Sequence, residues 1–373
     1  MKQSSISYFK NLDVLRLICF IIIFCRHGFF TNNQQIETSY LEPWRKQYFS
    51  FSSVGLDFFS VLSSFLITWL ILNEYNTFKE FNLKNFYVRR ILRIWPLYFL
   101  IIAIAYIGIP LISSLLNTES PSLPPIGWFL SFTSNYYAGY INENFLFFLL
   151  FLWFIAVEEQ FYLVWGFLLK YFNNYFEHLC ILLLTIYFVI TSFFSTPTFP
   201  SFYDTINYIP NFVIGAYLAK ISLTKTDLFA KIKGLKPSYW IILYLFTLGV
   251  LIFYNRIFSL PYLEHLKHLI LSVLFALIIF ENSFRAKSMF AFGQNKILSY
   301  LGKISFGLYC WHGLVITMIK KGMEKIGHVD TEVDVFLFYP IISLLFTIGI
   351  SILSFELFEK RFLKLKQYFS AFK

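Results

Sequence analysis

Two cationic side chains share one apolar segment near the start of the chain. Residues 12–30 read LDVLRLICFIIIFCRHGFF and contain Arg16 and His27. In a helix, with 100° and 1.5 Å per residue, this spacing puts both side chains on one face, about 16 Å apart along the axis. Arg16 is a permanent cation, whereas a histidine takes up or releases a proton near neutral pH. The pair could therefore stabilise negative charge at one level and move a proton at another.

The cost of placing such groups in an apolar helix makes them candidates for function. A charge inside a bilayer costs roughly 2.5–3.5 kcal/mol even on the lenient insertion scale, and intramembrane charges commonly mark functional paths. Asp13 lies one turn before Arg16 on the same face and is the expected partner of its guanidinium. We therefore treat Asp13, Arg16 and His27 as candidate site residues.

A second charged group lies in the apolar run 153–165, WFIAVEEQFYLVW. Glu158 and Tyr162 are four residues apart and share a helix face, while Glu159 points about 100° away. A carboxylate at this depth must face a cavity or a cation, and Arg16 or His27 is a natural partner. The alternative is a structural ion pair that fixes helix packing.

Two arginines stand on one helix face in the sequence FYVRRILRIWP of residues 86–96. Arg90 and Arg93 are three residues apart, and two guanidiniums on one face suit a phosphate-rich ligand such as a nucleotide or coenzyme A. The alternative is a positive-inside anchor at a helix start, with Trp95 at the interface and Pro96 in the first turn.

Two further polar residues stand inside apolar segments. Asp57 lies near the outer end of the second segment and could face His27 across the bundle. His312 follows Ser305 and Tyr309 on one polar stripe, and is either a functional residue or a hydrogen-bonded packing residue. We predict no metal site, because no spacing of His, Cys, Asp and Glu is typical of one.

Composition defines the class of protein. The chain is 57% hydrophobic and 14% charged, with a mean hydropathy of +0.62. These values predict an all-α, polytopic membrane helix bundle. The net charge of +10 is spread over short loops, so we expect the lipid bilayer and no nucleic acid as a partner.

About ten transmembrane helices are expected from the apolar runs. With the N-terminus, 74–93, 221–238, 282–297 and the C-terminus inward, most Lys and Arg residues lie inside, which favours an N-in/C-in topology. We place 117–145 outside, with 127–140 re-entrant against the bundle, and the alternative is that 127–140 spans the membrane. Residues 1–373 form one domain, divided into a bundle over 12–357 and a basic cytoplasmic tail over 358–373. The predicted segments are 12–30, 54–73, 94–116, 146–169, 178–195, 204–220, 239–255, 266–281, 298–319 and 335–357.

Taken together, five motifs in order resemble the membrane-bound acyltransferase-3 family, which O-acylates bacterial surface glycans. They are Leu12-Asp-Val-Leu-Arg16 with His27, Gly55-Leu-Asp-Phe-Phe with Ser63-Ser-Phe-Leu-Ile-Thr68, Phe86-Tyr-Val-Arg-Arg-Ile-Leu-Arg93, Trp153 with Ala156-Val-Glu-Glu-Gln-Phe-Tyr162, and Gly302 with Ser305-Phe-Gly-Leu-Tyr309 and Trp311-His312. The chain departs from the family pattern with Phe154 in place of Ser, Ser64 in place of Gly, and Arg26 beside the histidine.

The resemblance implies transfer of an acyl group from cytoplasmic acyl-CoA, acetyl-CoA above all, to a hydroxyl of an extracytoplasmic or lipid-linked sugar. It implies a multi-pass protein of the bacterial inner membrane, without a metal. The residues after the bundle are too few for the soluble esterase-like extension of some members, so we expect the acceptor chemistry within the membrane domain.

The same resemblance assigns roles to the candidate residues. His27 would act as general base or briefly carry the acyl group. Arg16 would stabilise negative charge or hold the thioester, and Glu158 would orient one of these cations. Arg90 and Arg93 would hold the coenzyme A phosphates. The alternative is a transporter or flippase for a glycan-lipid or a small metabolite, in which these charges line a path.

Overall fold

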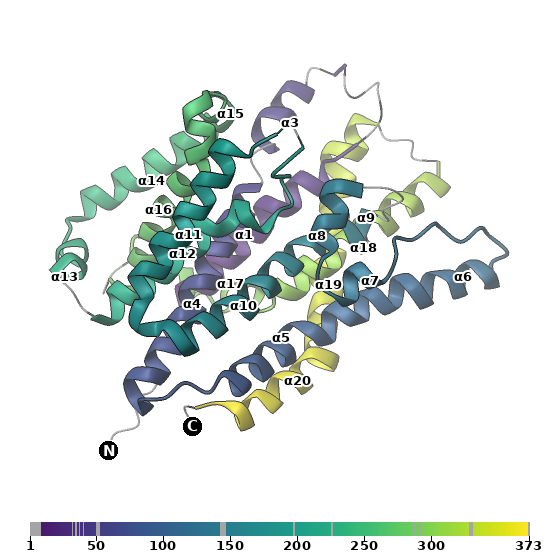
Figure 1. Ribbon diagram of the computed structural model, residues 1–373. Coiled ribbons are helices and arrows are strands. Elements are labelled where there is room, and N and C mark those ends of the chain that lie inside the picture. The colour runs from purple at the N-terminus through teal and green to yellow at the C-terminus, as the bar shows by residue number, and fades with distance from the viewer. Residues whose placement is uncertain are drawn as a thin grey trace.

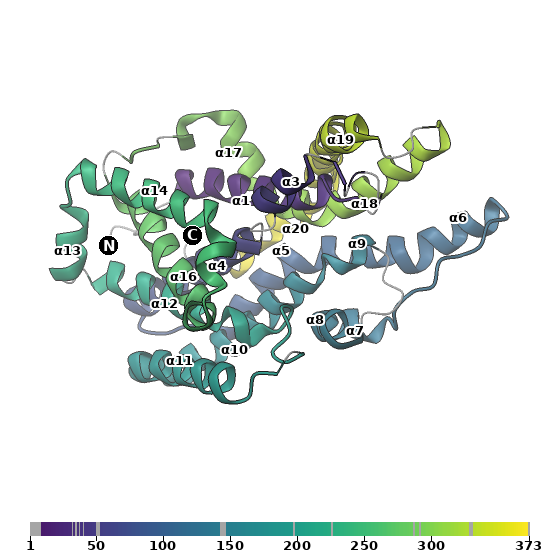
Figure 2. The ribbon, with the colours of Figure 1, turned by 90° about the horizontal axis from the view of Figure 1, so that it is seen from above.

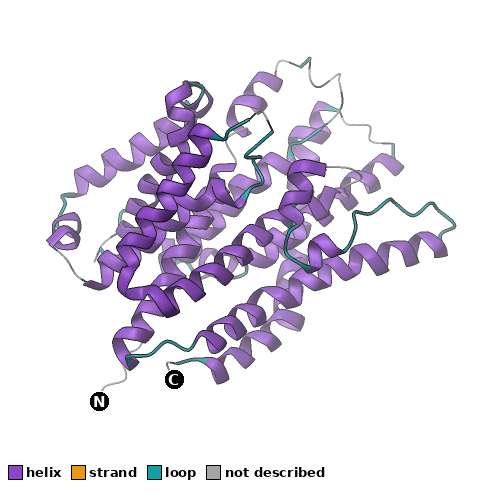
Figure 3. Ribbon diagram, viewed as in Figure 1, coloured by secondary structure: helices purple, strands orange, loops and turns teal. Residues whose placement is uncertain are grey.

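The protein is a bundle of helices. The computed structural model describes residues 9–31, 33, 36, 38–39, 41–49, 53–141, 147–196, 198–224, 227–285, 288–290, 292–327 and 331–371. Within these ranges all regular structure is helical (Figure 3). The predicted all-α class is therefore confirmed for the described part of the chain.

A helix lies on every predicted apolar segment. The long helices are α1 (Lys10–Gly28), α4 (Val54–Phe78), α5 (Leu83–Ala103), α10 (Trp153–Phe172), α11 (Phe176–Phe193), α12 (Ile209–Thr224), α14 (Pro237–Ile252), α16 (Pro261–Phe284), α18 (Ser305–Lys325) and α19 (Tyr339–Ser354) (Figure 1). Among the described residues, 5 helical stretches are long and apolar enough to cross a membrane, or 6 if a bent pair counts as one span. The protein is thus a multi-pass membrane protein, while the count of about ten and the orientation stay predictions.

The helix that carries the paired arginines begins earlier than the apolar pattern indicates. The Asn82 side chain accepts a hydrogen bond from the backbone N–H of Asn85 and caps α5, which starts at Leu83. The predicted loop over 74–93 is therefore wrong in extent, because its polar residues lie on helix ends. Pro96 lies inside α5 rather than in its first turn. The helix continues through a π-helical turn (Ile104–Gly108) into α6 (Ile109–Leu115).

Two packed groups of helices share α4 and α1. Viewed from above, α11, α12, α14 and α16 lie to one side, and α5, α18 and α19 to the other (Figure 2). We call α11, α12, α14 and α16 the second helix group, and its closest approach is between α12 and α4. A Cβ on Gly215 would lie 2.3 Å from the carbonyl oxygen of Val61, and the Ser64 hydroxyl donates to the carbonyl of Phe212. The small residues Gly215 and Ser64 therefore allow these two helices to pack closely.

The stretch after α6 folds back onto the bundle as short helical turns, α7 (Gly127–Leu130), α8 (Ser134–Tyr136) and a π-helical turn (Tyr137–Ile141). The Tyr98 hydroxyl of α5 donates to the carbonyl of Phe129 over 2.9 Å. Gln160 of α10 donates to the carbonyl of Phe132 over 2.7 Å. This segment is thus packed against the bundle, while its re-entrant or spanning character stays a prediction.

Candidate active site

The start of α1 is fixed by a close contact with α17 (Lys296–Lys303). A Cβ on Gly302 would lie 1.9 Å from the carbonyl oxygen of Asp13, so only glycine permits this approach. The contact holds the first turns of α1 in place. Arg16 then pairs with Asp13 over 2.6 Å, which confirms the partner predicted from the one-turn spacing.

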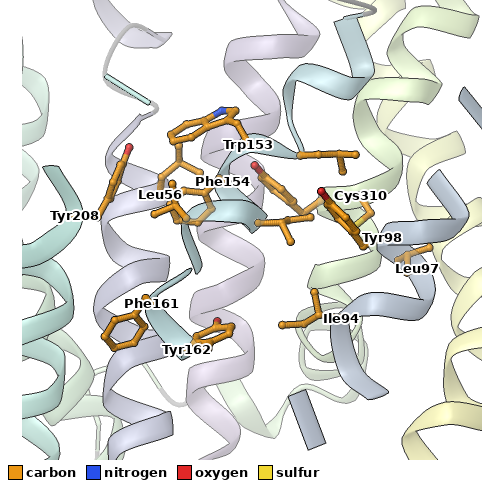
Figure 4. Close-up of a cluster of buried hydrophobic side chains, with 14 of the residues drawn as sticks. Leu56, Ile94, Leu97, Tyr98, Trp153, Phe154, Phe161, Tyr162, Tyr208 and Cys310 are labelled. Atoms are coloured by element: carbon orange, nitrogen blue, oxygen red, sulfur yellow. The ribbon is translucent and has the colours of Figure 1, made fainter. Parts of the chain in front are cut away.

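A cavity of about 110 Å³ lies where α1, α4, α5, α10 and α18 meet. Its polar lining consists of Arg16, Ser63, Arg90, Arg93, Glu158, Tyr162, Ser305 and Tyr309. Five of the predicted site residues, from three different helices, are therefore brought together. Figure 4 shows Ile94 of α5 and both Phe154 and Tyr162 of α10 around this space. Phe154, which departs from the family pattern, contributes an apolar wall.

Three guanidiniums and a single carboxylate line this cavity. Glu158 lies beside the hydroxyls of Ser63 and Tyr162 and in the field of Arg90 and Arg16. The guanidinium of Arg90 lies 5.7 Å from the ring centroid of Tyr162. The Nε atom of Arg90 is buried without a hydrogen-bond partner among the described residues. An excess of positive charge with a donor to spare suits an anionic ligand.

Three lining residues were not among the predicted site residues. The Ser63 hydroxyl lies 2.5 Å from the hydroxyl of Tyr162, and the sequence named Ser63 only as part of a motif. Ser305 and Tyr309 were placed on a stripe with His312, and both line the cavity. The signal for these two was therefore present in the helical spacing.

Two charged residues adjacent in sequence to the site residues, Glu159 and Arg89, do not line the cavity. The second carboxylate, Glu159, accepts a hydrogen bond from the indole Nε1 of Trp95 over 2.9 Å. Trp95 is thus a partner of a carboxylate rather than only an interfacial residue. Arg89 pairs with Glu74 over 3.1 Å and donates to the carbonyl of Phe369 over 2.6 Å. Arg89 therefore anchors the end of the chain.

His27 lies beyond the cavity, toward the other end of α1, and is half-buried. Its ring centroid is 4.2 Å from that of Phe151 and 5.5 Å from that of His312. Arg16 and His27 both face α18, at different depths, which agrees with the shared helix face that the spacing predicted. The structure separates them into two places, and His27 is not among the residues that line the cavity.

His312 has one defined hydrogen bond and one unused nitrogen. Its Nδ1 lies 2.6 Å from the carbonyl oxygen of Tyr309. A carbonyl only accepts, so Nδ1 carries the hydrogen and Nε2 of the neutral ring is an acceptor. This Nε2 is buried without a hydrogen-bond partner among the described residues. A basic nitrogen is thus available beside His27.

Aromatic side chains fill the space between the cavity and the two histidines. Tyr309 lines the cavity, and its ring centroid lies 5.5 Å from that of His312. Its hydroxyl donates to the carbonyl of Phe151 over 2.7 Å. The ring of Phe20, on α1 between Arg16 and His27, lies 6.0 Å from His312. Tyr309 is therefore the side chain through which the two places contact each other.

Asp57 does not face His27, so that expectation is wrong. Its carboxylate accepts from Asn211 Nδ2 of α12 over 2.7 Å and lies 2.7 Å from Nδ1 of His268 of α16. All three side chains are buried. The close packing of α12 on α4 turns Asp57 toward this second helix group. His268 lies in α16 (Pro261–Phe284), within the predicted segment 266–281, and was not among the predicted site residues.

The helix α3 (Glu42–Phe49) is anchored to the end of α1. Arg45 donates to both carboxylate oxygens of Glu42 over 2.6 and 2.5 Å and to the carbonyl of Phe29 over 3.5 Å. The hydrogen bond from Arg45 lowers the pKa of Glu42. The stabilisation is therefore present above the usual pKa of a glutamate and is lost as the pH falls through the lowered value.

Helices with apolar outer faces around a cation-rich cavity define a multi-pass membrane protein with a polar internal site. A family model described as an acyltransferase domain matches residues 9–355. The chain belongs to this acyltransferase-3 family, as the five motifs predicted. Over the described residues, no group of three or more His, Cys, Asp or Glu side chains could hold a metal ion.

Two known proteins of similar sequence are longer than this chain. A Staphylococcus aureus (strain COL) protein provisionally named an O-acetyltransferase is 25% identical over 390 aligned positions, covering 97% of this chain and 58% of its own length. Peptidoglycan O-acetyltransferase OatA of Listeria monocytogenes is 25% identical, over 85% of this chain and 51% of that protein. The chain thus spans little more than half the length of these relatives. No solved structure matches with significance.

Proposed function

We propose that this protein transfers an acyl group, acetyl above all, from cytoplasmic acyl-CoA to a hydroxyl of an extracytoplasmic or lipid-linked sugar in the bacterial inner membrane. The observation that carries the proposal is the cavity in which Arg16, Arg90, Arg93 and Glu158 meet below His27. The family membership and the names of the relatives support O-acyl transfer as the chemistry.

The donor enters from the end of the bundle that carries Arg90 and Arg93. These two guanidiniums hold phosphate groups of coenzyme A, because each offers several N–H donors and the local charge is positive. The acyl thioester then extends into the cavity, where Arg16 and the hydroxyls of Ser63 and Tyr162 surround it. Glu158 keeps the guanidinium of Arg16 or Arg90 oriented and limits the repulsion among the cations.

The acceptor reaches His27 from the opposite end. His27 removes the proton of the sugar hydroxyl, whose oxygen attacks the thioester carbonyl carbon. The C–S bond breaks, the new ester forms, and the coenzyme leaves as a thiol once its thiolate takes up a proton. Arg16 stabilises the negative charge that develops on the thioester. The side chain of Tyr309 must move for donor and acceptor to meet, since it lies between the two places.

Mass spectrometry of envelope glycans tests the proposal in cells that produce the wild type, His27→Ala or Arg16→Ala at equal membrane level. The wild type should add the mass of one acyl group, and both variants should lose at least about 10²-fold of it, the usual contribution of a general base or of an oxyanion donor. Ile18→Ala is the matched control, because this exposed residue lies on the same helix. Near-normal acylation in both site variants would contradict the proposal, and glycan-lipid export without acylation would favour a transporter.

A further inference from the structure

A second cavity, of about 430 Å³, adjoins the first at the end of the bundle where the chain starts and ends. It lies between α4, α5, α17 and the C-terminal segment formed by α20 (Lys360–Leu365) and a 3-10 turn (Lys366–Phe369). Arg93 lines both cavities. The polar lining of the larger one consists of Glu74, Arg89, Arg93, Lys303, Lys366, Gln367 and Ser370.

The lining of this second cavity is strongly positive. It contains four cations and a single carboxylate. Arg89 takes up that carboxylate, Glu74, so it contributes no net charge to the cavity. Lys366 lies in the field of the three arginines of α5, which repel it. Lys303 lies 5.8 Å from the ring centroid of Phe355. Its positive charge also attracts the exposed carboxylate of Glu356.

The C-terminal segment is held in this position by contacts that leave Lys366 available. Arg89 donates to the carbonyl of Phe369 over 2.6 Å and pairs with Glu74. Glu74 in turn accepts from the backbone N–H of Asn82 over 2.9 Å. The predicted basic tail is thus folded against α4 and α5 through Phe369. The cations around this cavity repel one another, and a bound anion would relieve that repulsion. The lining therefore favours a polyanionic ligand.

We propose that Lys303 and Lys366 bind a phosphate group of the donor that is separate from the phosphates held by Arg90 and Arg93. The inference rests on the proposed function. Coenzyme A fits this arrangement, since its diphosphate and its ribose 3′-phosphate are two anionic groups some distance apart. The acyl arm lies in the smaller cavity, the diphosphate lies at Arg93 between the cavities, and the 3′-phosphate lies at the two lysines.

Anionic headgroups of the inner leaflet offer the same phosphate chemistry to lysines at this depth. The test must therefore separate a bound coenzyme from a lipid. Binding of free coenzyme A and of 3′-dephospho-coenzyme A to the whole protein is measured by calorimetry in nanodiscs of phosphatidylcholine. A second set of discs contains phosphatidylglycerol.

The wild type should bind coenzyme A about tenfold more tightly than the dephospho form, the usual effect of one charge-assisted contact. Lys303→Gln and Lys366→Gln should each weaken binding of coenzyme A alone and remove most of this preference. Lys366→Arg should restore it. Lys364→Gln, an exposed lysine of the same segment that does not line the cavity, should change neither ligand.

Equal weakening of both ligands by Lys366→Gln, or no change, overturns the inference while leaving the proposed donor intact. If the two lysines bind a lipid headgroup, Lys366→Gln should not alter the preference for coenzyme A over its dephospho form in either set of discs. The variant should instead lose the thermal stability that phosphatidylglycerol gives to the wild type. Failure of the wild type to bind either form of coenzyme A overturns both the inference and the proposed donor.

Discussion

The two ends of α1 differ in how they accommodate polar groups. Around Arg16 the bundle is hollow and carries three guanidiniums against one lining carboxylate. Around His27 it is filled by aromatic rings, with Phe151 at 4.2 Å and His312 at 5.5 Å between ring centroids. The first end thus has space and an excess of positive charge, which suit an anionic ligand, and the second holds two side chains that can remain neutral.

This difference shows why one apolar helix can carry two expensive residues. A fixed cation needs a counter-ion, and Asp13 supplies one at 2.6 Å, while a ligand can supply the rest. A histidine can lose its charge instead and pack as an aromatic ring. Tyr309 lines the cavity, and its ring centroid lies 5.5 Å from that of His312, so one side chain borders both environments.

The largest expected effect concerns the carboxylate at the hollow end. Glu158→Gln should lower acyl transfer about 10²-fold, because it removes the charge that orients the guanidiniums near the thioester. Glu159→Gln is the matched control, since this neighbouring carboxylate bonds to Trp95 and does not line the cavity. Acyl transfer by membranes with equal protein amounts is measured for both. Equal losses in the two variants would erase the distinction between the lining carboxylate and its neighbour.

A smaller effect is expected at the filled end. His312→Asn keeps an N–H donor for the carbonyl of Tyr309 but removes the unpartnered ring nitrogen beside His27. If that nitrogen assists His27, acyl transfer should fall about tenfold, a modest part of a general-base contribution, with unchanged binding of coenzyme A. Measuring kcat and the KM for acetyl-CoA separates an effect on acyl transfer from an effect on donor binding.

Normal turnover by His312→Asn would mean that His312 only packs in the aromatic layer. A raised KM for acetyl-CoA would instead show that the two ends of α1 are not independent. His312→Phe serves as the comparison variant, because it keeps the ring and loses both nitrogens.

The parts of the site that sequence predicts are those that depend on one helix at a time. Arg16 pairs with Asp13 because residues three apart on a helix are neighbours. Arg90 and Arg93 face one cavity for the same reason, and so do Glu158 and Tyr162. Because each buried charge must face a partner or a cavity, these residues are expected to lie together.

Contacts between helices are not encoded in such local spacing. Asp57 was expected to face His27, yet the close approach of Gly215 to Val61 brings α12, and with it Asn211, against Asp57. Nothing in the apolar pattern indicates which helix packs on α4. For the same reason, the sequence does not indicate that His268 of α16 lies against Asp57.

The smallest expected effect on catalysis lies in this second helix group and defines the limits of the site. Asp57→Ala leaves the buried Asn211 and His268 without their shared acceptor. The unpaired groups should cost about 1–3 kcal/mol of stability and lower the melting temperature in detergent. Asp57→Asn keeps an acceptor oxygen and should lose less. Acyl transfer per folded molecule should stay within about twofold of the wild type, because surface and core changes away from a site act mainly on stability. A large loss of turnover in well-folded Asp57→Asn would instead extend the active site from the α1–α10–α18 interface to α12 and α16.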